Sequence, residues 1–232
     1  MTADTAGSGS SAGLLDVSNL VIGVLGGTGD QGRGLARRLS IAGHRVLIGS
    51  RDAGRASAAA AELGGGPRLG GGVNRDVAAE ANIVIAAIPW EGHRDLLATL
   101  AEPLAGKIVI DCVNPIGFDA HGAFPLSVPE GSAAQQAAAV LPDSTVVGAF
   151  HHVSATLLLD PGVDRVDLDV LVLGDHRAAT DQVIALAGEI PGVRGVYGGR
   201  LRNCGQVEAF TANLVSINRR YKAHAGIRIT DV

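Results

Sequence analysis

Aromatic residues and cysteines are scarce in this chain of 232 residues. Only 3% of the residues are Phe, Trp or Tyr, whereas 33 are glycine, so the core must depend on close packing of small and branched side chains. Two cysteines, Cys112 and Cys204, are too few for a disulfide framework and lack the C-x-x-C spacing. We interpret them as small buried hydrophobic residues in a reducing compartment.

Long apolar runs and basic leaders are absent as well. The longest nonpolar stretch, residues 83–90, is far shorter than the roughly 20 residues of a membrane span. Residues 1–18 lack Lys, Arg and the apolar stretch of a secretory signal, so we expect a disordered leader and a soluble, cytoplasmic protein. The formal net charge of −4 argues against general nucleic-acid binding.

The most informative segment is a glycine-rich turn between a buried strand at 20–25 and the start of a helix. The turn consists of Gly27, Thr28, Gly29, Asp30, Gln31 and Gly32. Gly27 permits the tight turn, Gly29 lets the backbone approach a phosphate, and Gly32 lets the helix pack closely on the strand. Free N–H groups at the helix N-terminus attract anions. The segment therefore predicts the pyrophosphate site of a dinucleotide.

Apolar strands and amphipathic helices alternate through the rest of the chain. We expect strands at 45–49, 83–88, 107–111, 145–150, 168–173 and 193–197. We expect helices at 30–41, 53–63, 74–81, 91–100, 132–141, 176–187 and 206–221, and a long loop at 113–129. This order predicts an α/β fold with a Rossmann-type, doubly wound, mostly parallel sheet over 19–150, followed by a smaller C-terminal α/β extension over 151–232.

The residues at the end of the second strand indicate which dinucleotide binds. NAD-binding chains carry an acidic residue there that holds the ribose 2′-hydroxyl, whereas this chain has Ser50 and Arg51. A guanidinium pairs well with a 2′-phosphate, and Arg55 on the next helix can reach the same phosphate. Asp52 complicates this prediction, and both arginines can also be plain surface charges. We favour NADP(H) over NAD(H).

Four longer strings resemble one enzyme family. They are VLGGTGDQGRGLARRLSIAGHRVLIGSR, IVIAAIPWEGH, VVGAFHHVSA and INRRYKAHAGIRI. They are similar to the NADPH-dependent coenzyme F420 reductases, also called F420H2:NADP+ oxidoreductases, and the similarity covers nearly everything from Val21 onward. The resemblance implies an enzyme that transfers a hydride between NADP(H) and the 8-hydroxy-5-deazaflavin of coenzyme F420. The transfer is direct, between stacked rings, without covalent catalysis.

The resemblance also implies a set of binding residues, on loops that parallel-sheet geometry brings to one crevice. The residues on the adenine side of the cofactor are Thr28 to Gln31, Ser50, Arg51 and Arg55. Trp90 and Ala155 lie along the cofactor toward the nicotinamide, and Ile88 and Pro89 are cofactor-binding walls of the same crevice. Those facing the deazaflavin are His151, His152 and Val153. We expect no catalytic side chain and no metal, although either histidine can assist a proton transfer or be a hydrogen-bonded wall residue.

The C-terminal part of the chain is locally basic. Between residues 190 and 230 the only carboxylate is Glu208. The basic residues there are Arg194, Arg200, Arg202, Arg219, Arg220, Lys222 and Arg228. They can steer the anionic tail of coenzyme F420, or form a solvated helix face or a subunit interface. The apolar side of helix 206–221 is either core or the face of a homodimer.

Two other functions stay open. One is an NADP-dependent reductase of another small substrate, and the hydroxyacid reductases among these use a catalytic lysine. The chain has only Lys107 and Lys222, and neither is placed like such a catalyst. The other is a non-catalytic NADP(H) redox sensor, which needs a pocket for only one ligand. In each case the expected ligands are small molecules.

Overall fold

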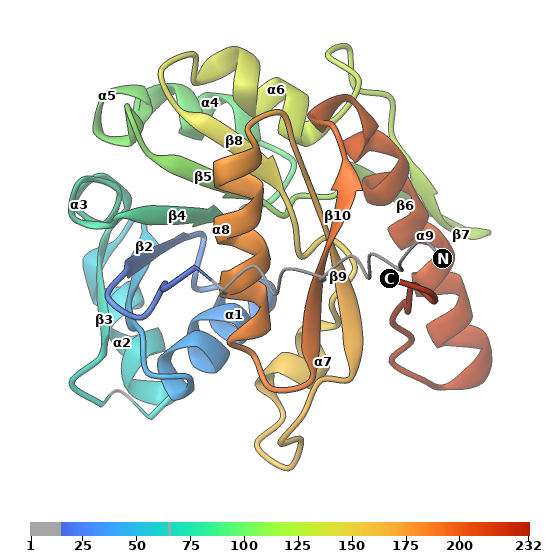
Figure 1. The fold of residues 1–232 in the computed structure, drawn as a ribbon, viewed down its shortest axis with the longest axis horizontal. Helices are drawn as coiled ribbons and strands as arrows, with labels where there is room; N and C mark the ends of the chain where they lie inside the picture. Colours follow the sequence, from blue (N-terminus) through green and yellow to red (C-terminus); the bar gives the residue numbers. More distant parts are fainter. Residues whose placement is uncertain (1–14, 65) are drawn as a thin grey trace, which may run out of the picture.

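The computed structural model describes residues 15–64 and 66–232, which form an eight-stranded sheet between two layers of helices (Figure 1). The strand order is β10-β9-β8-β5-β4-β1-β2-β3. In chain order these strands are β1 (Val21–Leu25), β2 (Arg45–Ser50), β3 (Leu69–Val73), β4 (Ile83–Ala86), β5 (Ile108–Asp111), β8 (Thr145–Gly148), β9 (Leu168–Gly174) and β10 (Val193–Gly199). Only β8 and β9 pair antiparallel within this sheet. The predicted doubly wound, mostly parallel sheet is confirmed.

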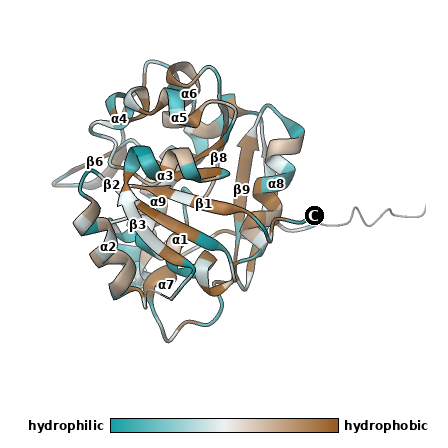
Figure 2. Cartoon of the chain, turned by 90° about the vertical axis from the view of Figure 1, so that its left-hand side faces the viewer, coloured by the Kyte–Doolittle hydropathy of each residue, from teal (hydrophilic) through white to brown (hydrophobic). Residues whose placement is uncertain are grey.

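Two hydrophobic clusters, one on each face of the sheet, define the helix layers. The first layer contains α1 (Asp30–Ile41), α2 (Ala53–Glu62), α7 (Ala155–Leu159) and α8 (Arg177–Gly188). The second contains α3 (Asn74–Glu80), α4 (His93–Thr99), α5 (Ala101–Leu104), α6 (Ala133–Val140) and α9 (Cys204–Tyr221), with the short 3-10 helix η1 (Leu201–Asn203). Because side chains alternate along a strand, Ile83 and Ile85 face the first layer, and Val84 faces the second. Figure 2 shows these apolar strands between the helices.

Several segments differ from the sequence-based expectation, among them the short helix α5 and the 3-10 helix η1, which were not predicted. Segment 113–129 contains an antiparallel hairpin, β6 (Ile116–Asp119) and β7 (Gly122–Pro125), so the predicted long loop is wrong. Its turn forms because the Asp119 carboxylate accepts hydrogen bonds from the N–H groups of His121 and Gly122. Strand β3 and helix α7 were also not predicted. β3 has the sequence LGGGV, and its pairing with β2 holds it in place.

Most of the leader expected over 1–18 lies outside the described residues. Its described end is packed on the domain, because Val17 is buried and the Asp16 carboxylate accepts two hydrogen bonds from Ser18. At the other end of the chain, β9 and β10 belong to the same sheet as β1. Among the described residues, none of the helices combines the length and apolarity that a membrane crossing requires.

Strand β9 extends past the edge of the sheet at its junction with β8. Only Leu173 and Gly174, at the end of β9, pair with β8. The earlier part of β9 therefore continues beyond the carboxyl end of β8, beside residues 151–153. There the N–H of Leu171 donates to Nε2 of His152 at 3.4 Å. The two long strands β9 and β10 stand as a side wall next to the carboxyl edge (Figure 1).

Candidate functional site

A cavity of about 490 Å³ lies at the carboxyl ends of β1, β2, β3 and β4. The glycine turn contributes Thr28, Gly29, Asp30 and Gln31 to its wall. The end of β2 and the start of α2 contribute Ser50, Arg51 and Arg55, and the loop after β4 contributes Ile88 and Pro89. The structure thus brings most of the sequence-predicted cofactor residues to one cavity. Gly27, Gly32, Trp90 and Ala155 are not part of its wall.

The glycines of the turn have different roles in the structure. Gly26, not Gly27, makes the tight turn, with φ +69°. A Cβ at Gly27 would meet Cγ2 of Ile48 at 2.8 Å, and one at Gly32 would meet the Cα of Gly27 at 2.7 Å. At Gly29, by contrast, a Cβ would meet only the Gly26 carbonyl oxygen, at 3.6 Å. The protein itself has room for a side chain at Gly29, and a ligand that approaches the backbone explains the glycine.

The arginines near the end of β2 make that end of the cavity locally positive, while Asp30 and Glu91 line other parts of its wall. Arg51 and Arg55 are exposed, and neither makes an ion pair with a described residue. Asp52 does not cancel their charge directly, because its carboxylate accepts the N–H of Arg55 at 2.8 Å and caps α2. Ser50 accepts the N–H of Asp52 at 3.3 Å. This arrangement suits a phosphate group better than a ribose hydroxyl.

The loop after β4 is braced by a buried histidine. His93 is fully buried, with Nε2 2.7 Å from Oδ2 of Asp111 and Nδ1 3.0 Å from Oε1 of Gln136. Burial opposes the charged imidazole, but the hydrogen bond and charge of Asp111 outweigh it and raise the pKa of His93. The ring of half-buried Trp90 lies 5.6 Å from that of His93. His93 therefore supports the loop that carries Trp90 rather than facing a ligand.

Glu208 is buried near His93 and Asp111, and it caps the N-terminus of α6. Its carboxylate accepts the N–H groups of Ala133 at 2.8 Å and Ala134 at 3.2 Å, at the start of α6. Burial raises the pKa of Glu208 to about 7, although the two backbone N–H groups act in the other direction. Donor atoms of His151, Cys204 and Glu208 lie within 4.8 Å of one another. We assign this cluster to the core, because Glu208 is occupied by α6 and burial raises the pKa of the Cys204 thiol.

The side chains predicted to face the deazaflavin are buried. His151, His152 and Val153 follow β8, and their exposed fractions are 3%, 3% and 6%. Burial lowers the pKa of each histidine to about 4, so both imidazoles are neutral at neutral pH. The prediction that these side chains face a ligand does not match this burial. Nothing in the sequence of residues 151–153 indicates whether these side chains are buried in the protein or exposed to a ligand.

The backbone of the same segment is held from several sides. Phe150 has a φ of +64°, an uncommon conformation for a bulky residue and one that clusters at functional sites. The carbonyl of His151 accepts hydrogen bonds from the Asn114 amide at 2.7 Å and the Thr211 hydroxyl at 3.3 Å. Gln31, on the glycine turn, donates to the Phe150 carbonyl at 3.2 Å. The glycine turn and the loop after β8 are therefore directly linked.

Helices α1 and α7 extend this link. The guanidinium of Arg38, on α1, donates to the carbonyls of Leu157 at 2.6 Å and Leu158 at 2.8 Å. It also donates to the carbonyl of Asp160 at 3.2 Å, so it closes the C-terminal end of α7. Ala155 begins α7 and is half-buried. Its position relative to the glycine turn is thus held by this buried arginine and by the close packing of α1 on α7, where a Cβ at Gly34 would meet Cβ of Leu158 at 2.6 Å.

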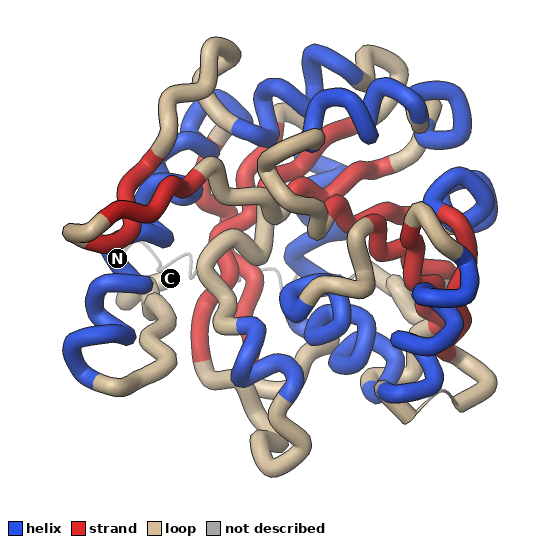
Figure 3. The backbone as a smooth tube through the Cα atoms, turned by 180° about the vertical axis from the view of Figure 1, so that it is seen from behind, coloured by secondary structure: helices blue, strands red, loops and turns tan. Residues whose placement is uncertain are grey.

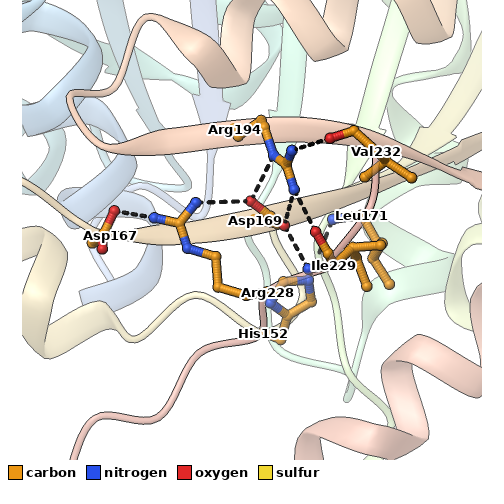
Figure 4. A network of polar contacts seen from close by, with 8 residues as sticks. All are labelled: His152, Asp167, Asp169, Leu171, Arg194, Arg228, Ile229 and Val232. Carbon is orange, nitrogen blue, oxygen red and sulfur yellow. Dashed lines mark hydrogen bonds and ion pairs between the residues drawn. The ribbon is translucent and has the colours of Figure 1, made fainter.

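The basic segment is partly neutralised in the structure. Arg194 and Arg228 both pair with the buried carboxylate of Asp169, and Arg228 also pairs with Asp167 (Figure 4). The hydrogen bond from Arg194 is the main reason why the pKa of Asp169 falls to about 2. Arg200 lies 3.8 Å from Asp175. Three of the seven basic residues between 190 and 230 therefore pair with carboxylates that precede residue 190 in the sequence.

Two other cations of that segment line a second cavity, of about 550 Å³. It lies between the hairpin β6–β7 and the C-terminal half of α9, which run side by side (Figures 1 and 3). Arg219 and Arg220 face Phe118 and His121 across it. Arginines in the last turn of a helix also interact favourably with its dipole.

The fold and the first cavity define a Rossmann-type dinucleotide-binding protein. Residues 21–115 match the family model described as NADP oxidoreductase, coenzyme F420-dependent. The F420-dependent NADP reductase of Methanothermobacter thermautotrophicus is 39% identical over 229 residues, which cover 94% of this chain and 98% of that protein. The enzyme of the same name from Methanocaldococcus jannaschii is also 39% identical, over 91% of this chain and 98% of its own length. The chain belongs to the F420-dependent NADP reductase family, which confirms the resemblance.

A solved structure agrees with this membership. A protein of Arthrobacter sp. FB24, assigned provisionally as an F420-dependent NADP reductase, superposes with a TM-score of 0.79. It is 28% identical, and the match covers 91% of this chain and all of that one. The similarity therefore extends well beyond residues 21–115, which the family model matches.

Proposed function

We propose that this chain is an enzyme that transfers a hydride between NADP(H) and coenzyme F420. The observation that carries the proposal is the 39% identity to an F420-dependent NADP reductase over nearly the full length of both proteins. The cavity supports it, because it combines an open glycine turn with two arginines that lack described ion-pair partners. This combination fits the pyrophosphate and 2′-phosphate of NADP(H).

In this proposal the chain acts by positioning two rings. The N–H groups at the start of α1 hold the pyrophosphate, and Arg51 and Arg55 hold the 2′-phosphate. Ile88, Pro89, Trp90 and Ala155 lie toward the nicotinamide. Reduction of F420 by NADPH moves a hydride from nicotinamide carbon 4 to deazaflavin carbon 5 and consumes one proton from water. Holding the two carbons at roughly 3–3.5 Å is the main catalytic task.

The loop after β8 forms the wall on the deazaflavin side in this proposal. His151, His152 and Val153 support that wall from beneath, and their backbone, held by Asn114 and Thr211, faces the ring. With a pKa of about 4, both imidazoles lack the acidic imidazolium form at neutral pH and are weak bases. We therefore give no side chain an acid–base role.

Mixing the protein with NADPH and oxidised coenzyme F420 tests the activity directly. We expect the deazaflavin absorbance to fall with time, and to fall far more slowly with NADH in place of NADPH. A mixture without protein is the control. Tight NADPH binding without any loss of deazaflavin absorbance would support a redox sensor and contradict the proposal.

The position of Lys107 argues against the hydroxyacid reductases as an alternative. Lys107 precedes β5, at the amino edge of the sheet, opposite the cavity. Its ammonium donates to the carbonyls of Ala78, Ala79 and Ala81 and closes the C-terminal end of α3. Lys222 follows α9 as its C-cap. Neither lysine is near the first cavity, so a lysine-dependent reduction has no catalyst there.

We further propose that the protein is a cytoplasmic homodimer with no nucleic-acid partner. Phe118, on the hairpin, is 71% exposed, and Tyr221, on α9, is 73% exposed. Phe124, Phe210 and Ile217, on the same two elements, are also exposed. Exposed aromatic residues on neighbouring elements of a chain so poor in them suggest a protein interface. The two buried, free cysteines fit a reducing compartment.

Light scattering after size-exclusion chromatography tests the dimer. We expect Phe118→Ser with Tyr221→Ser to convert a dimer into a monomer that keeps its fold. Tyr197→Ser is the matched control, because Tyr197 is 53% exposed but lies on β10. A wild-type protein that elutes with the mass of one chain would contradict the dimer.

A further inference from the structure

Asn74 is a polar residue of the first cavity that the sequence-based set of cofactor residues does not include. It is the first residue of α3, directly after β3, and it lines the cavity together with Ser50 and Arg51. Its side chain is largely buried, with 7% exposed. Its Oδ1 atom is buried and accepts no hydrogen bond from any described residue. The amide nitrogen is not among the buried atoms without a partner, and no hydrogen bond to a described residue occupies it, so it is the end of the side chain that can reach the cavity.

The sheet fixes where this amide lies. In the parallel pairing of β2 and β3, Ser50 is opposite Val73. Arg51 and Asn74 are the next residues on the two strands, so they leave the sheet at the same level. The backbone also makes room for the amide, because a Cβ at Gly49 would meet Oδ1 of Asn74 at 2.7 Å. Asn74 thus lies beside the residues assigned to the 2′-phosphate.

We propose that Asn74 is a specificity-determining residue that binds the phosphorylated adenosine ribose of NADP(H). Its amide nitrogen donates to the 2′-phosphate, next to Arg51, while its Oδ1 stays enclosed against Gly49. A carboxamide nitrogen is a hydrogen-bond donor, and phosphate oxygens are strong acceptors. The inference rests on the proposed NADP(H) binding. It adds a residue that distinguishes NADP(H) from NAD(H) by binding the 2′-phosphate.

A carboxylate at this position reverses the preference. Asn74→Asp keeps the size of the side chain but replaces the donor by a negative charge, which repels a phosphate and accepts well from a 2′-hydroxyl. We expect the Kd of NADPH to rise roughly 30-fold or more, and the Kd of NADH to stay the same or fall. Asn74→Ala removes the donor, and we expect the Kd of NADPH to rise about 10-fold with NADH within about threefold.

Isothermal titration with NADPH and NADH, without coenzyme F420, measures these constants on the full chain. Asn82→Asp and Asn82→Ala are the matched controls, because Asn82 follows the other end of α3 and its Oδ1 accepts the N–H of Val21. These controls should leave the ratio of the two constants unchanged. Thermal melting of each variant confirms that it is folded, and near-isosteric Asn74→Asp tests the proposal if Asn74→Ala unfolds.

The outcomes separate this inference from the proposed function. If both Asn74 variants weaken NADPH and NADH by the same factor, or change neither, the inference is overturned. If Arg51→Ala also leaves NADPH affinity unchanged, then the 2′-phosphate site itself is wrong. Turnover with F420 is measured separately, so a protein that binds NADPH with these preferences but reduces no F420 contradicts only the activity.

Discussion

Two polar regions of this molecule differ in how their hydrogen-bonding groups are satisfied. In the cavity over β1–β4, Arg51 and Arg55 make no ion pair with a described residue, and Oδ1 of Asn74 has no partner. In the cluster formed by β5, α4, α6 and α9, His93 and Asp111 bond to each other and Glu208 caps α6. A ligand can supply partners for the exposed arginines of the first region, whereas the second region holds helices together. The lack of a partner does not by itself mark a binding site, because buried ring nitrogens of His44, His151 and His152 also have no partner among the described residues.

We expect the largest effect when a hydrogen-bond partner is removed from the cluster of His93, Asp111 and Glu208. The quantity affected is the free energy of unfolding. Asp111→Ala leaves Nε2 of His93 buried and without a partner, and it also removes the acceptor for the Val113 N–H. We expect the free energy of unfolding to fall by about 3–5 kcal/mol, as in other broken buried pairs. Urea denaturation measures this loss. A change below about 1 kcal/mol would show that the cluster is not scaffold.

The pH dependence of stability tests Glu208 in the same cluster. The pKa rises from 4.5 to about 7 on folding, so the folded state retains a proton that the unfolded state releases between these values. The contribution of Glu208 to stability therefore falls by about 3 kcal/mol as pH rises from 4.5 to 7. Glu208→Gln keeps an acceptor for α6 but has no carboxyl group to titrate. Its stability should therefore not show this decrease between pH 4.5 and 7.

The comparison with wild type at each pH isolates this effect. His151 and His152, with a pKa of about 4 in the folded state, bind fewer protons than in the unfolded state and so make stability rise between pH 4 and 6.5. Both proteins share that contribution. Equal pH profiles for wild type and Glu208→Gln in urea denaturation would contradict the raised pKa.

In the unsatisfied region, a substitution should change binding and leave stability intact. We expect Arg51→Ala to raise the Kd of NADPH about 10- to 100-fold, with NADH within about threefold, because only NADPH carries the 2′-phosphate. Arg45→Ala is the control. Arg45 begins β2, at the end of the strand away from Arg51, and it pairs with Glu80. Equal losses for both cofactors would make Arg51 a general contact.

We expect the smallest effects for alanine substitutions at two glycines of the turn, Gly27 and Gly29, which should differ in whether stability or binding changes. Gly29→Ala should melt at nearly the wild-type temperature, because the new Cβ has room, yet bind NADPH about 10-fold more weakly by blocking the phosphates. Gly27→Ala should instead lose stability, by about 1–3 kcal/mol, since its Cβ would meet Ile48 and the Val24 carbonyl. Thermal melting and titration of both variants check the contrast. An unstable Gly29→Ala would contradict it.

Much of the fold could be predicted because the central strands alternate or are apolar throughout. Ile83 and Val84 face opposite layers, and both faces are covered, so a continuous apolar run indicated a central strand. Strand β3 was missed, since three of its five residues are glycine and only pairing with β2 makes it a strand. The hairpin β6–β7 was hidden by its prolines, although Asp119 and Gly122 are a common turn signal.

The candidate site could be predicted only as far as the glycine turn and the strand ends. The residues of 27–31, 50–55 and 88–89 follow strands that the sequence indicates, so their convergence was foreseeable. Asn74 was not, because its place depends on β3. The burial of His151 and His152 was also not foreseeable, because it comes from β9 and α9, which are far away in the sequence.

Arg38 ties the first helix of the glycine turn to the end of α7. Under the proposed function, we expect this buried guanidinium to keep the helix that receives the pyrophosphate and the helix that starts at Ala155 in one relative orientation. The nicotinamide would then be oriented before the deazaflavin binds.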